Sequence, residues 1–137
     1  MKIIFLDVDG VLNCEYTHTK GMSLFPIDPY MVLLVDRIVQ ATGAKVVLSS
    51  SWRYHPESAA IVKKSVDFID VTPMNRGTSS RGTEIKAWLD AHPDVTKYAI
   101  LDDNTDMLTA QMPSFFKTDW DKGLTDEVAN KVIAHLL

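Results

Sequence analysis

The sequence contains one cysteine, Cys14, in 137 residues. A single cysteine excludes an intramolecular disulfide, and no cluster of Cys and His has the spacing of a zinc site. This pattern fits a reducing compartment, and we expect a cytoplasmic location.

Long hydrophobic runs are also missing. The apolar residues after Lys2 end at Asp7, so the run is too short for the core of an export signal. The longest other uninterrupted apolar run extends from Met31 to Val35, far short of the roughly 20 residues needed to cross a bilayer. We therefore expect no association with a membrane.

A large excess of charge of one sign is absent as well. The chain has 14 basic and 18 acidic residues, for a net charge of -4. This balance excludes a generally basic nucleic-acid-coating protein, so binding to any polyanion would need a local basic patch. The 46% hydrophobic content argues against disorder. The length predicts a single domain covering residues 1–137.

Short runs rich in β-branched residues are spaced along the chain, as expected for buried parallel strands. The clearest lie at residues 3–6, 45–48 and 98–101, and weaker ones lie at 67–71 and 115–118.

Helical patterns separate these runs. One helix is predicted from Asp28, as N-cap, to Gly43; a second begins near Thr83 and ends before Pro93; a third begins at Thr125. Residues 13–27 and 72–82 are predicted to be loops. The alternation predicts an α/β fold with a five-stranded parallel sheet covered by helices on both faces, and loops at the carboxyl ends of its strands would carry the site.

Acidic residues stand where two of the predicted strands end. Asp7 and Asp9 follow the first strand, with Gly10 allowing a tight turn, and Asp102 and Asp103 follow the strand at 98–101. The carboxyl ends of parallel strands meet at one edge, so these carboxylates would repel one another strongly without a counter-ion. Oxygen ligands without His or Cys favour magnesium. The alternative is that they are turn formers and helix caps.

Three segments resemble motifs of the haloacid dehalogenase (HAD) superfamily of phosphotransferases. Residues 3–12 (IIFLDVDGVL) resemble the first motif, residues 46–53 (VVLSSSWR) the second, and residues 100–106 (ILDDNTD) the fourth. The third motif is a lone basic residue, for which Arg81 and Lys86 are both candidates.

A finer resemblance involves residues 49–53, 81–89 and 123–125. Together they are similar to a subgroup of HAD domains associated with RNA repair proteins. The resemblance implies a three-layer Rossmann-like HAD fold and a magnesium-dependent phosphomonoester hydrolase that acts through an aspartyl-phosphate.

The same resemblance assigns roles to the acidic residues. Asp7 would be the nucleophile, and Asp9 would be the general acid and base, with its backbone carbonyl also binding magnesium. Asp102 would bind the metal directly, and Asp103 would be either a ligand or an orienting group. Asp106 is better interpreted as a helix cap.

A hydroxyl and a cation would complete the site. Neighbouring strand residues point to opposite sides, so Ser49 and Ser50 cannot both reach the phosphoryl group easily, and we slightly favour Ser50. The alternative is that the serines end the strand and cap the next segment. We favour Arg81 over Lys86 because Arg81 is expected in a flexible loop and a guanidinium suits a phosphoryl group.

The chain leaves little room for the cap domain that HAD enzymes of small metabolites commonly carry. The implied open site admits a large substrate, such as a nucleic-acid end with a 3′ or 5′ phosphate, or a phosphoprotein. Residues 45–64 carry four basic residues and one acidic residue. Within them Trp52, Arg53 and Tyr54 are candidates to contact phosphates or stack on a base, with Lys86 as a further substrate-binding candidate. The alternative is a solvated helix face with a core tryptophan.

Other functional classes compete with a nucleic-acid phosphatase. A phospho-accepting receiver domain also combines clustered Asp, a hydroxyl and a cation, but its phosphorylated Asp ends a middle strand, whereas Asp7 ends the first. A non-catalytic phosphate-binding module and a phosphatase of small metabolites remain alternatives. The sequence leaves the substrate, the oligomeric state and any partner protein open.

Overall fold

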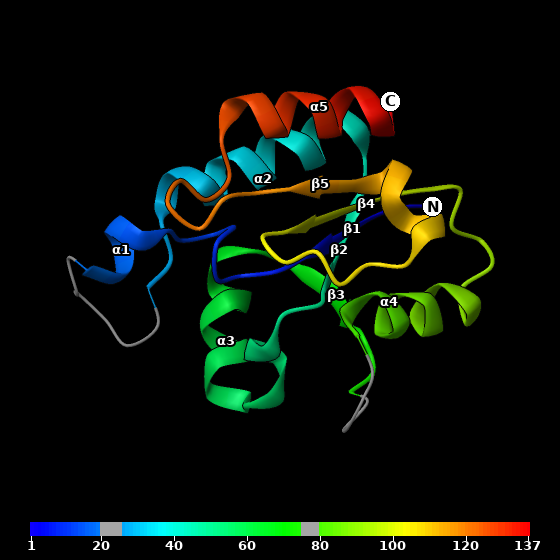
Figure 1. Ribbon diagram of the computed structural model, residues 1–137, viewed down its shortest axis with the longest axis horizontal. Coiled ribbons are helices and arrows are strands. Elements are labelled where there is room, and N and C mark those ends of the chain that lie inside the picture. The colour runs from blue at the N-terminus through cyan, green and yellow to red at the C-terminus, as the bar shows by residue number, and fades with distance from the viewer. Residues whose placement is uncertain (20–25, 75–79) are drawn as a thin grey trace.

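The computed structural model describes residues 1–19, 26–74 and 80–137, and the predicted loops at 13–27 and 72–82 therefore lie partly outside the described residues. Strands and helices alternate along the chain (Figure 1). The strands are β1 (Lys2–Leu6), β2 (Lys45–Leu48), β3 (Phe68–Val71), β4 (Lys97–Asp102) and β5 (Phe115–Lys117). The helices are α1 (Glu15–Thr19), α2 (Pro29–Thr42), α3 (Pro56–Ser65), α4 (Arg81–Asp90) and α5 (Asp126–Leu136), with 3-10 turns η1 (Ser51–Tyr54) and η2 (Thr109–Ser114).

The described strands form a five-stranded sheet in the order β3-β2-β1-β4-β5, and every neighbouring pair is parallel. The first strand in sequence thus lies at the centre of the sheet. Its buried residues Ile3 to Leu6 pair with β2 on one side and β4 on the other. The predicted α/β class and parallel sheet are confirmed.

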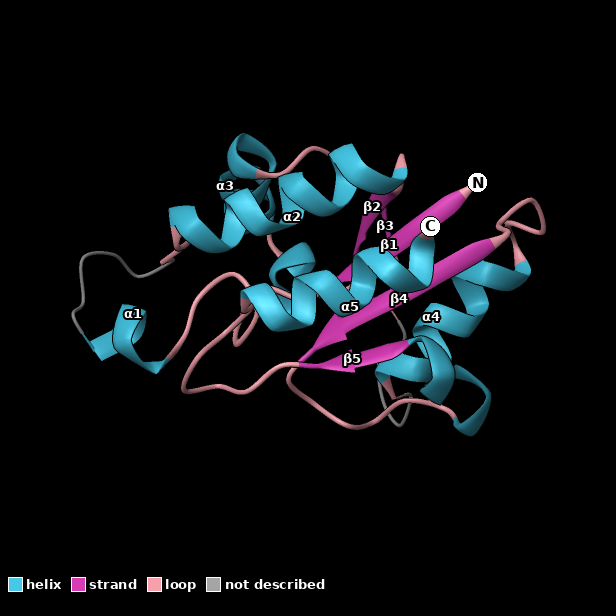
Figure 2. Cartoon of the chain, turned by 90° about the horizontal axis from the view of Figure 1, so that it is seen from above, coloured by secondary structure: helices cyan, strands magenta, loops and turns pink. Residues whose placement is uncertain are grey.

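Side chains from the two faces of the sheet enter two apolar clusters. The larger contains Ile4 and Leu6 of β1 together with residues of α2, α3 and α5. The smaller contains Ile3 and Phe5 packed against Ile85 and Trp88 of α4. Figures 1 and 2 show α2 and α5 running side by side over one face of the sheet, with α4 away from them. Helices therefore cover both faces, as predicted.

The helix ends follow local capping chemistry. The Asp28 carboxylate accepts the Tyr30 N–H at the start of α2, and Gly43, with φ of 73°, ends that helix. The start of α4 differs from the prediction: the Ser80 hydroxyl accepts the Thr83 N–H, so the helix begins at Arg81 rather than near Thr83. Arg81 therefore lies on the first helical turn and not in a flexible loop.

A second difference concerns the segment after the first motif. Residues 13–27 were predicted as loop, but Glu15–Thr19 form the short helix α1. None of the helices in the described ranges is long and apolar enough to span a membrane.

Candidate active site

The carboxyl edge of the sheet gathers residues at the ends of three strands, β1, β2 and β4. The Asp7 N–H donates to the Leu101 carbonyl and the Ser49 N–H donates to the Leu6 carbonyl, each at 3.0 Å. These bonds extend the strand pairing one residue beyond β1 and β2. The ends of the predicted motifs are thus neighbours in space, although they are far apart in sequence.

Strand alternation places the key side chains on one face. Asp7 lies two residues after Phe5, Ser49 two residues after Val47, and Asp102 two residues after Ile100. Phe5, Val47 and Ile100 all belong to the apolar cluster that packs against α4. Because side chains alternate along a strand, Asp7, Ser49 and Asp102 point to the face on which α4 begins.

The first residue of α4 supplies the cation at this edge. Nη1 of Arg81 lies 2.8 Å from Oδ1 of Asp7 and 2.8 Å from Oδ2 of Asp102. The backbone N–H of Arg81 donates to Oδ2 of Asp106 at 2.9 Å, which anchors the start of α4 to the segment after β4. Asp106 therefore acts on the helix end, as its interpretation as a cap requires.

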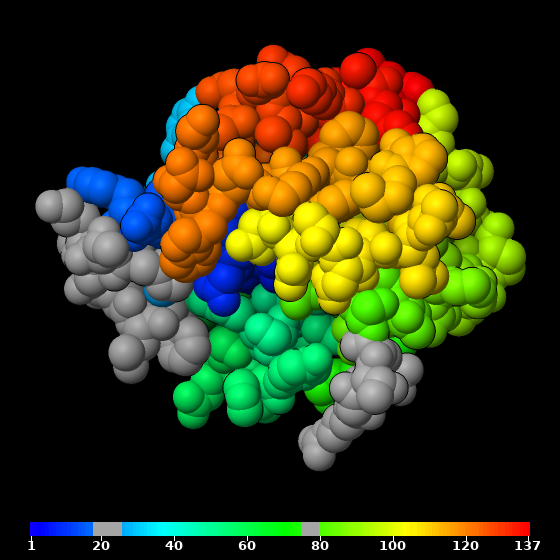
Figure 3. Space-filling view, in the orientation of Figure 1, coloured from blue at the N-terminus to red at the C-terminus, as the bar shows by residue number. Residues whose placement is uncertain are grey.

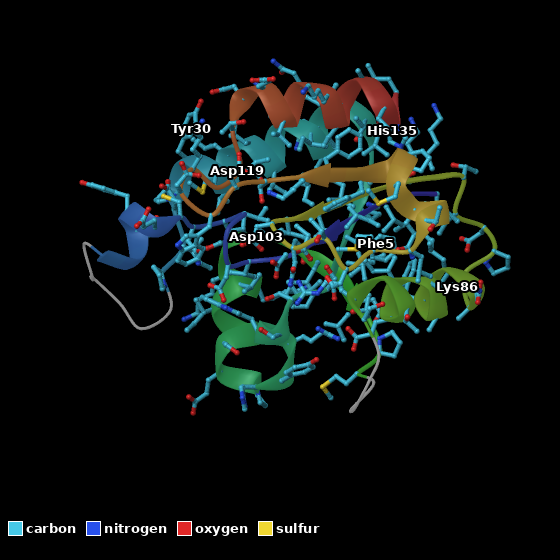
Figure 4. All side chains as sticks on the ribbon, in the orientation of Figure 1. Phe5, Tyr30, Lys86, Asp103, Asp119 and His135 are labelled. Atoms are coloured by element: carbon cyan, nitrogen blue, oxygen red, sulfur yellow. The ribbon has the colours of Figure 1, made fainter. Side chains whose placement is uncertain are left out.

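Three carboxylates form a group that fits a metal ion. Asp7, Asp102 and Asp103 each offer one oxygen, and these oxygens lie within 4.8 Å of one another. Gly10, with φ of 82°, leaves space for Asp103, since a Cβ at that position would stand 2.4 Å from its Oδ2. This oxygen-only set has the ligand chemistry of magnesium. Figure 4 labels Asp103 near the middle of the molecule.

Burial raises the pKa of all three carboxyl groups, and repulsion by a neighbouring carboxylate adds to the shift at Asp7 and at Asp103. Burial, together with the charge of Asp102, raises the pKa of Asp7 to about 7, although Arg81 opposes the shift. Burial likewise raises the pKa of Asp102 and of Asp103. Burial acts to lower the pKa of Arg81, but the charges of Asp7 and Asp102 outweigh it and raise that pKa. A further cation would favour the ionised carboxylates.

The structure distinguishes the two candidate serines. The Ser50 hydroxyl accepts the Trp52 N–H and caps η1. The Ser49 Oγ is buried and has no hydrogen-bond partner among the described residues. A buried hydroxyl without a partner is unusual and costs free energy. Ser49 is therefore a better candidate than Ser50 for the hydroxyl that donates a hydrogen bond to the phosphoryl group. The sequence pattern had slightly favoured Ser50.

The Asp9 carboxylate stands apart from the group of three. Its Oδ2 accepts the indole N–H of Trp52 at 2.9 Å, and its Oδ1 accepts the side-chain amide of Asn13 at 3.0 Å. Sequence reasoning missed Asn13 and considered Trp52 as a base-stacking residue. Trp52 is instead buried, with 8% exposure, in agreement with the alternative of a core tryptophan.

The placement of Arg53 contradicts a substrate-binding role. Its side chain is only 1% exposed and forms an ion pair with Glu84. Its guanidinium carbon also lies over the Tyr54 ring, 4.7 Å from the ring centroid. Its remaining hydrogen bonds go to backbone carbonyls: Nε donates to Thr72, Nη1 to Ser49 and Ser50, and Nη2 to Pro73. A guanidinium has five N–H donors, so this set uses its full capacity.

Lys86 also lies away from the candidate site residues at the carboxyl edge of the sheet. Its Nζ pairs with Asp90 one turn later on α4, and the side chains are 58% and 65% exposed. Figure 4 labels Lys86 well away from Asp103, toward the far end of α4. The expectation that Lys86 contacts substrate therefore does not fit its position, and Arg81 is the candidate cation of this edge.

The carboxyl edge is accessible from outside. Figure 3 shows the blue segment after β1 recessed between the yellow segment after β4, the orange segment after β5 and the green segment after β2. No separate cap domain folds over this edge among the described residues. An open edge of this kind can admit the end of a large substrate.

Comparison with known protein families agrees with the sequence motifs that meet at this edge. Residues 3–129 match the family model described as the HAD domain in Swiss Army Knife RNA repair proteins. No curated protein and no solved structure matches the chain. The family match covers the strands and the candidate site together, and it confirms the resemblance found in the sequence motifs.

Proposed function

The chain belongs to the family of HAD domains in Swiss Army Knife RNA repair proteins, and from this premise we propose that it is a magnesium-dependent phosphomonoester hydrolase acting through an aspartyl-phosphate on Asp7. One observation carries the proposal: the Arg81 guanidinium contacts both Asp7 and Asp102 at an edge that holds three convergent carboxylates. This arrangement supports the proposal, because Asp7 as nucleophile, Arg81 as cation and a metal-binding set of carboxylates would then act at one place.

In the first step, an oxygen of Asp7 attacks the phosphorus in line with the ester oxygen. The bond from phosphorus to the ester oxygen breaks, and Asp9 donates a proton to that oxygen as it leaves. In the second step, Asp9 takes a proton from water, whose oxygen attacks the phosphorus of the aspartyl-phosphate. The bond to Asp7 breaks, inorganic phosphate leaves, and Asp7 is regenerated.

Other residues would stabilise the phosphoryl group during both steps. Arg81 can form charge-assisted hydrogen bonds with its oxygens, and the free Ser49 hydroxyl can donate another. Asp7, Asp102 and Asp103 would hold magnesium, with the Asp9 backbone carbonyl as a further ligand. When bound there, the ion supplies positive charge that favours ionised carboxylates and offsets the charge of the phosphoryl oxygens.

We further propose that the substrate is a nucleic-acid end with a 3′ or 5′ phosphate. The family description, which names RNA repair proteins, supports this class, and so does the open carboxyl edge. The burial of Arg53 removes one element of the basic patch expected from residues 45–64. A phosphatase of small metabolites is the alternative, since both substrates would use the same chemistry at Asp7.

Phosphate release from a panel of phosphate esters, with and without magnesium, tests the proposal. We expect magnesium-dependent release by the wild-type chain, none by Asp7→Asn, whose amide is not an anionic nucleophile, and nearly none by Asp9→Asn. Asp119→Asn is the matched control, because that exposed carboxylate pairs with Lys117 outside the metal group. Unchanged turnover in folded Asp7→Asn would exclude the aspartyl-phosphate mechanism.

A further inference from the structure

We propose that Trp52 and Asn13 are positioning residues that hold the Asp9 carboxylate in the orientation needed for proton transfer. The inference rests on the proposed function, because it concerns the residue that serves there as general acid and base. The ring of Trp52 is too deeply buried to stack on a base. Positioning Asp9 is the role that we assign to Trp52 instead.

Trp52 and Asn13 donate to different oxygens of the Asp9 carboxylate. The Trp52 indole N–H donates to Oδ2 at 2.9 Å, and the Asn13 amide donates to Oδ1 at 3.0 Å. With a donor at each oxygen, the plane of the carboxyl group is fixed and rotation about its side-chain bonds is opposed. Trp52 lies on η1, in the second motif, and Asn13 lies in the loop after the first motif. The hydrogen bond from Trp52 to Asp9 therefore links the second motif to the first.

Trp52 is itself firmly placed. Its backbone N–H donates to the Ser50 hydroxyl at 3.1 Å, and its carbonyl accepts the Ser58 hydroxyl at 2.6 Å. The ring belongs to the larger apolar cluster. Because both the backbone and the ring of Trp52 are held in place, its indole N–H has a fixed position beside the Asp9 carboxylate.

Asn13 is placed as firmly on the other side. Its side chain is fully buried, its Oδ1 accepts the Gly10 N–H at 3.0 Å, and its Nδ2 also donates to the Pro26 carbonyl at 3.0 Å. The same amide thus ties the turn that carries Asp9 to the segment before α2. Both donors are therefore in position before any substrate arrives.

Such positioning matters because proton transfer requires the acid to lie within hydrogen-bond reach of the leaving oxygen. Asp9 follows β1 on a turn, where its side chain would otherwise sample several rotamers. Fixing a reacting group in advance lowers the entropic part of the barrier. Loss of either donor should therefore slow the steps in which Asp9 moves a proton, and leave the others largely unchanged.

The value of kcat/KM isolates one such step, because it reports formation of the aspartyl-phosphate and not its later hydrolysis. Glycerol 2-phosphate has an alkoxide leaving group that needs a proton, whereas 4-nitrophenyl phosphate releases a stable phenolate without one. Trp52→Phe keeps the ring and removes the N–H. We expect kcat/KM for the alkyl ester to fall about 10- to 100-fold, and that for the aryl ester to fall less than about 3-fold.

Trp88→Phe is the matched control. The indole N–H of Trp88 also donates to an aspartate, Oδ2 of Asp70 at 2.8 Å, and its ring is buried under α4. This variant should lower kcat/KM for both esters equally or not at all. A loss of stability alone therefore cannot imitate the expected difference between the two esters.

Asn13→Ala provides an independent variant, decisive if Trp52→Phe does not fold, because it removes the donor to Asp9 without placing a second carboxylate beside it. It should show the same selective loss on the alkyl ester. In an Asp9→Asn background, Trp52→Phe should add no further loss on that ester, because the two residues act as one unit.

An active wild-type chain whose ratio of the two kcat/KM values is unchanged in both folded variants overturns this inference alone. A wild-type chain that releases no phosphate from either ester in magnesium overturns the proposed function together with the inference.

Discussion

The guanidinium of Arg53 and the carboxylate of Glu84 form a buried ion pair, with Nη2 and Oε2 2.9 Å apart and side-chain exposures of 1% and 7%. Arg53 belongs to η1, directly after the strand end that carries Ser49, and Glu84 lies one turn after Arg81 on α4. The pair therefore fixes the helix that supplies the cation relative to the strand that supplies the hydroxyl.

Removing one member of this pair should destabilise the fold strongly. Glu84→Gln leaves the buried Arg53 charge without its partner, and such a loss costs about 3–5 kcal/mol. Urea unfolding would measure the free energy of unfolding of each variant. Lys86→Ala is the matched control, since it removes an exposed ion pair on the same helix and should change stability by no more than about 1 kcal/mol.

Arg53→Lys should also destabilise, because a lysine cannot replace five planar donors. Equal and small effects of Glu84→Gln, Arg53→Lys and Lys86→Ala would show that the buried pair does not anchor α4. The assignment of Arg81 to a fixed position would then lose its structural support.

The sequence predicted the sheet well because its signal is local. Buried parallel strands such as residues 3–6 read as short apolar runs, and the acids that follow them mark the strand ends. The parallel topology then implies that Asp7 and Asp102 lie at one edge. This reasoning needs no knowledge of side-chain partners, and the structure indeed brings these carboxylates together.

Local sequence patterns do not predict contacts between side chains that are far apart in the sequence. Arg53 was expected to contact substrate because a basic residue beside aromatic residues is typical of nucleic-acid surfaces, but Glu84 lies 31 positions later and gave no sign of pairing with it. In the sequence Glu84 directly precedes the apolar Ile85, and this position alone does not predict a partner for it.

Local capping explains the other differences. The Ser80 hydroxyl caps α4, so the helix begins at Arg81. The Ser50 hydroxyl caps η1, whereas the Ser49 hydroxyl has no hydrogen-bond partner in the described part of the chain. Strand alternation alone excluded that both serines face the site. It did not identify which one does, because that depends on which face α4 covers.

Metal-free protein should lose stability as pH rises through the window set by Asp7. The ordinary pKa of an aspartate is 3.8, and burial is the largest cause that raises the pKa of Asp7 to about 7 in the fold. The folded state therefore binds more protons than the unfolded state between these values, so the free energy of unfolding falls as pH rises from about 4 to about 7. Asp7→Asn should flatten that dependence.

Urea unfolding in a chelator at several pH values between 4 and 8 would measure this slope in both proteins. A wild-type free energy of unfolding that rises across the same window, or a slope unchanged in Asp7→Asn, would contradict the assignment of the shift to Asp7.

Magnesium should bind at Asp7, Asp102 and Asp103 and raise the melting temperature, because a ligand of the native state alone stabilises it. Calorimetric titration should show one site, and Asp102→Asn should abolish both the heat and the thermal shift. Asp119→Asn should leave both unchanged. If neither heat nor a thermal shift appears in the wild-type chain, and phosphate also fails to bind, the metal assignment is wrong.

Oligonucleotides with a 3′ or 5′ phosphate should have a higher kcat/KM than mononucleotides or sugar phosphates. Within the described ranges no cap domain covers this edge, so little water is excluded around a small substrate. Catalysis therefore gains more from contacts spread along a larger substrate. Because such contacts neutralise phosphates, the advantage should shrink as salt rises. Tyr54 is 46% exposed on η1, and the Arg53 guanidinium lies over its ring. It is the residue that we expect to stack on a base.

Tyr54→Ala should therefore lower kcat/KM for oligonucleotides while leaving that for 4-nitrophenyl phosphate nearly unchanged. The loss should be about 5-fold or more, since stacking on an aromatic side chain contributes about 1–3 kcal/mol per base. Tyr30→Ala is the control, because Tyr30 is similarly exposed, at 52%, but lies on α2 and bonds to Asp126. If a sugar phosphate is the best substrate and both tyrosine variants act alike on every substrate, the nucleic-acid proposal fails while the phosphatase chemistry at Asp7 stands.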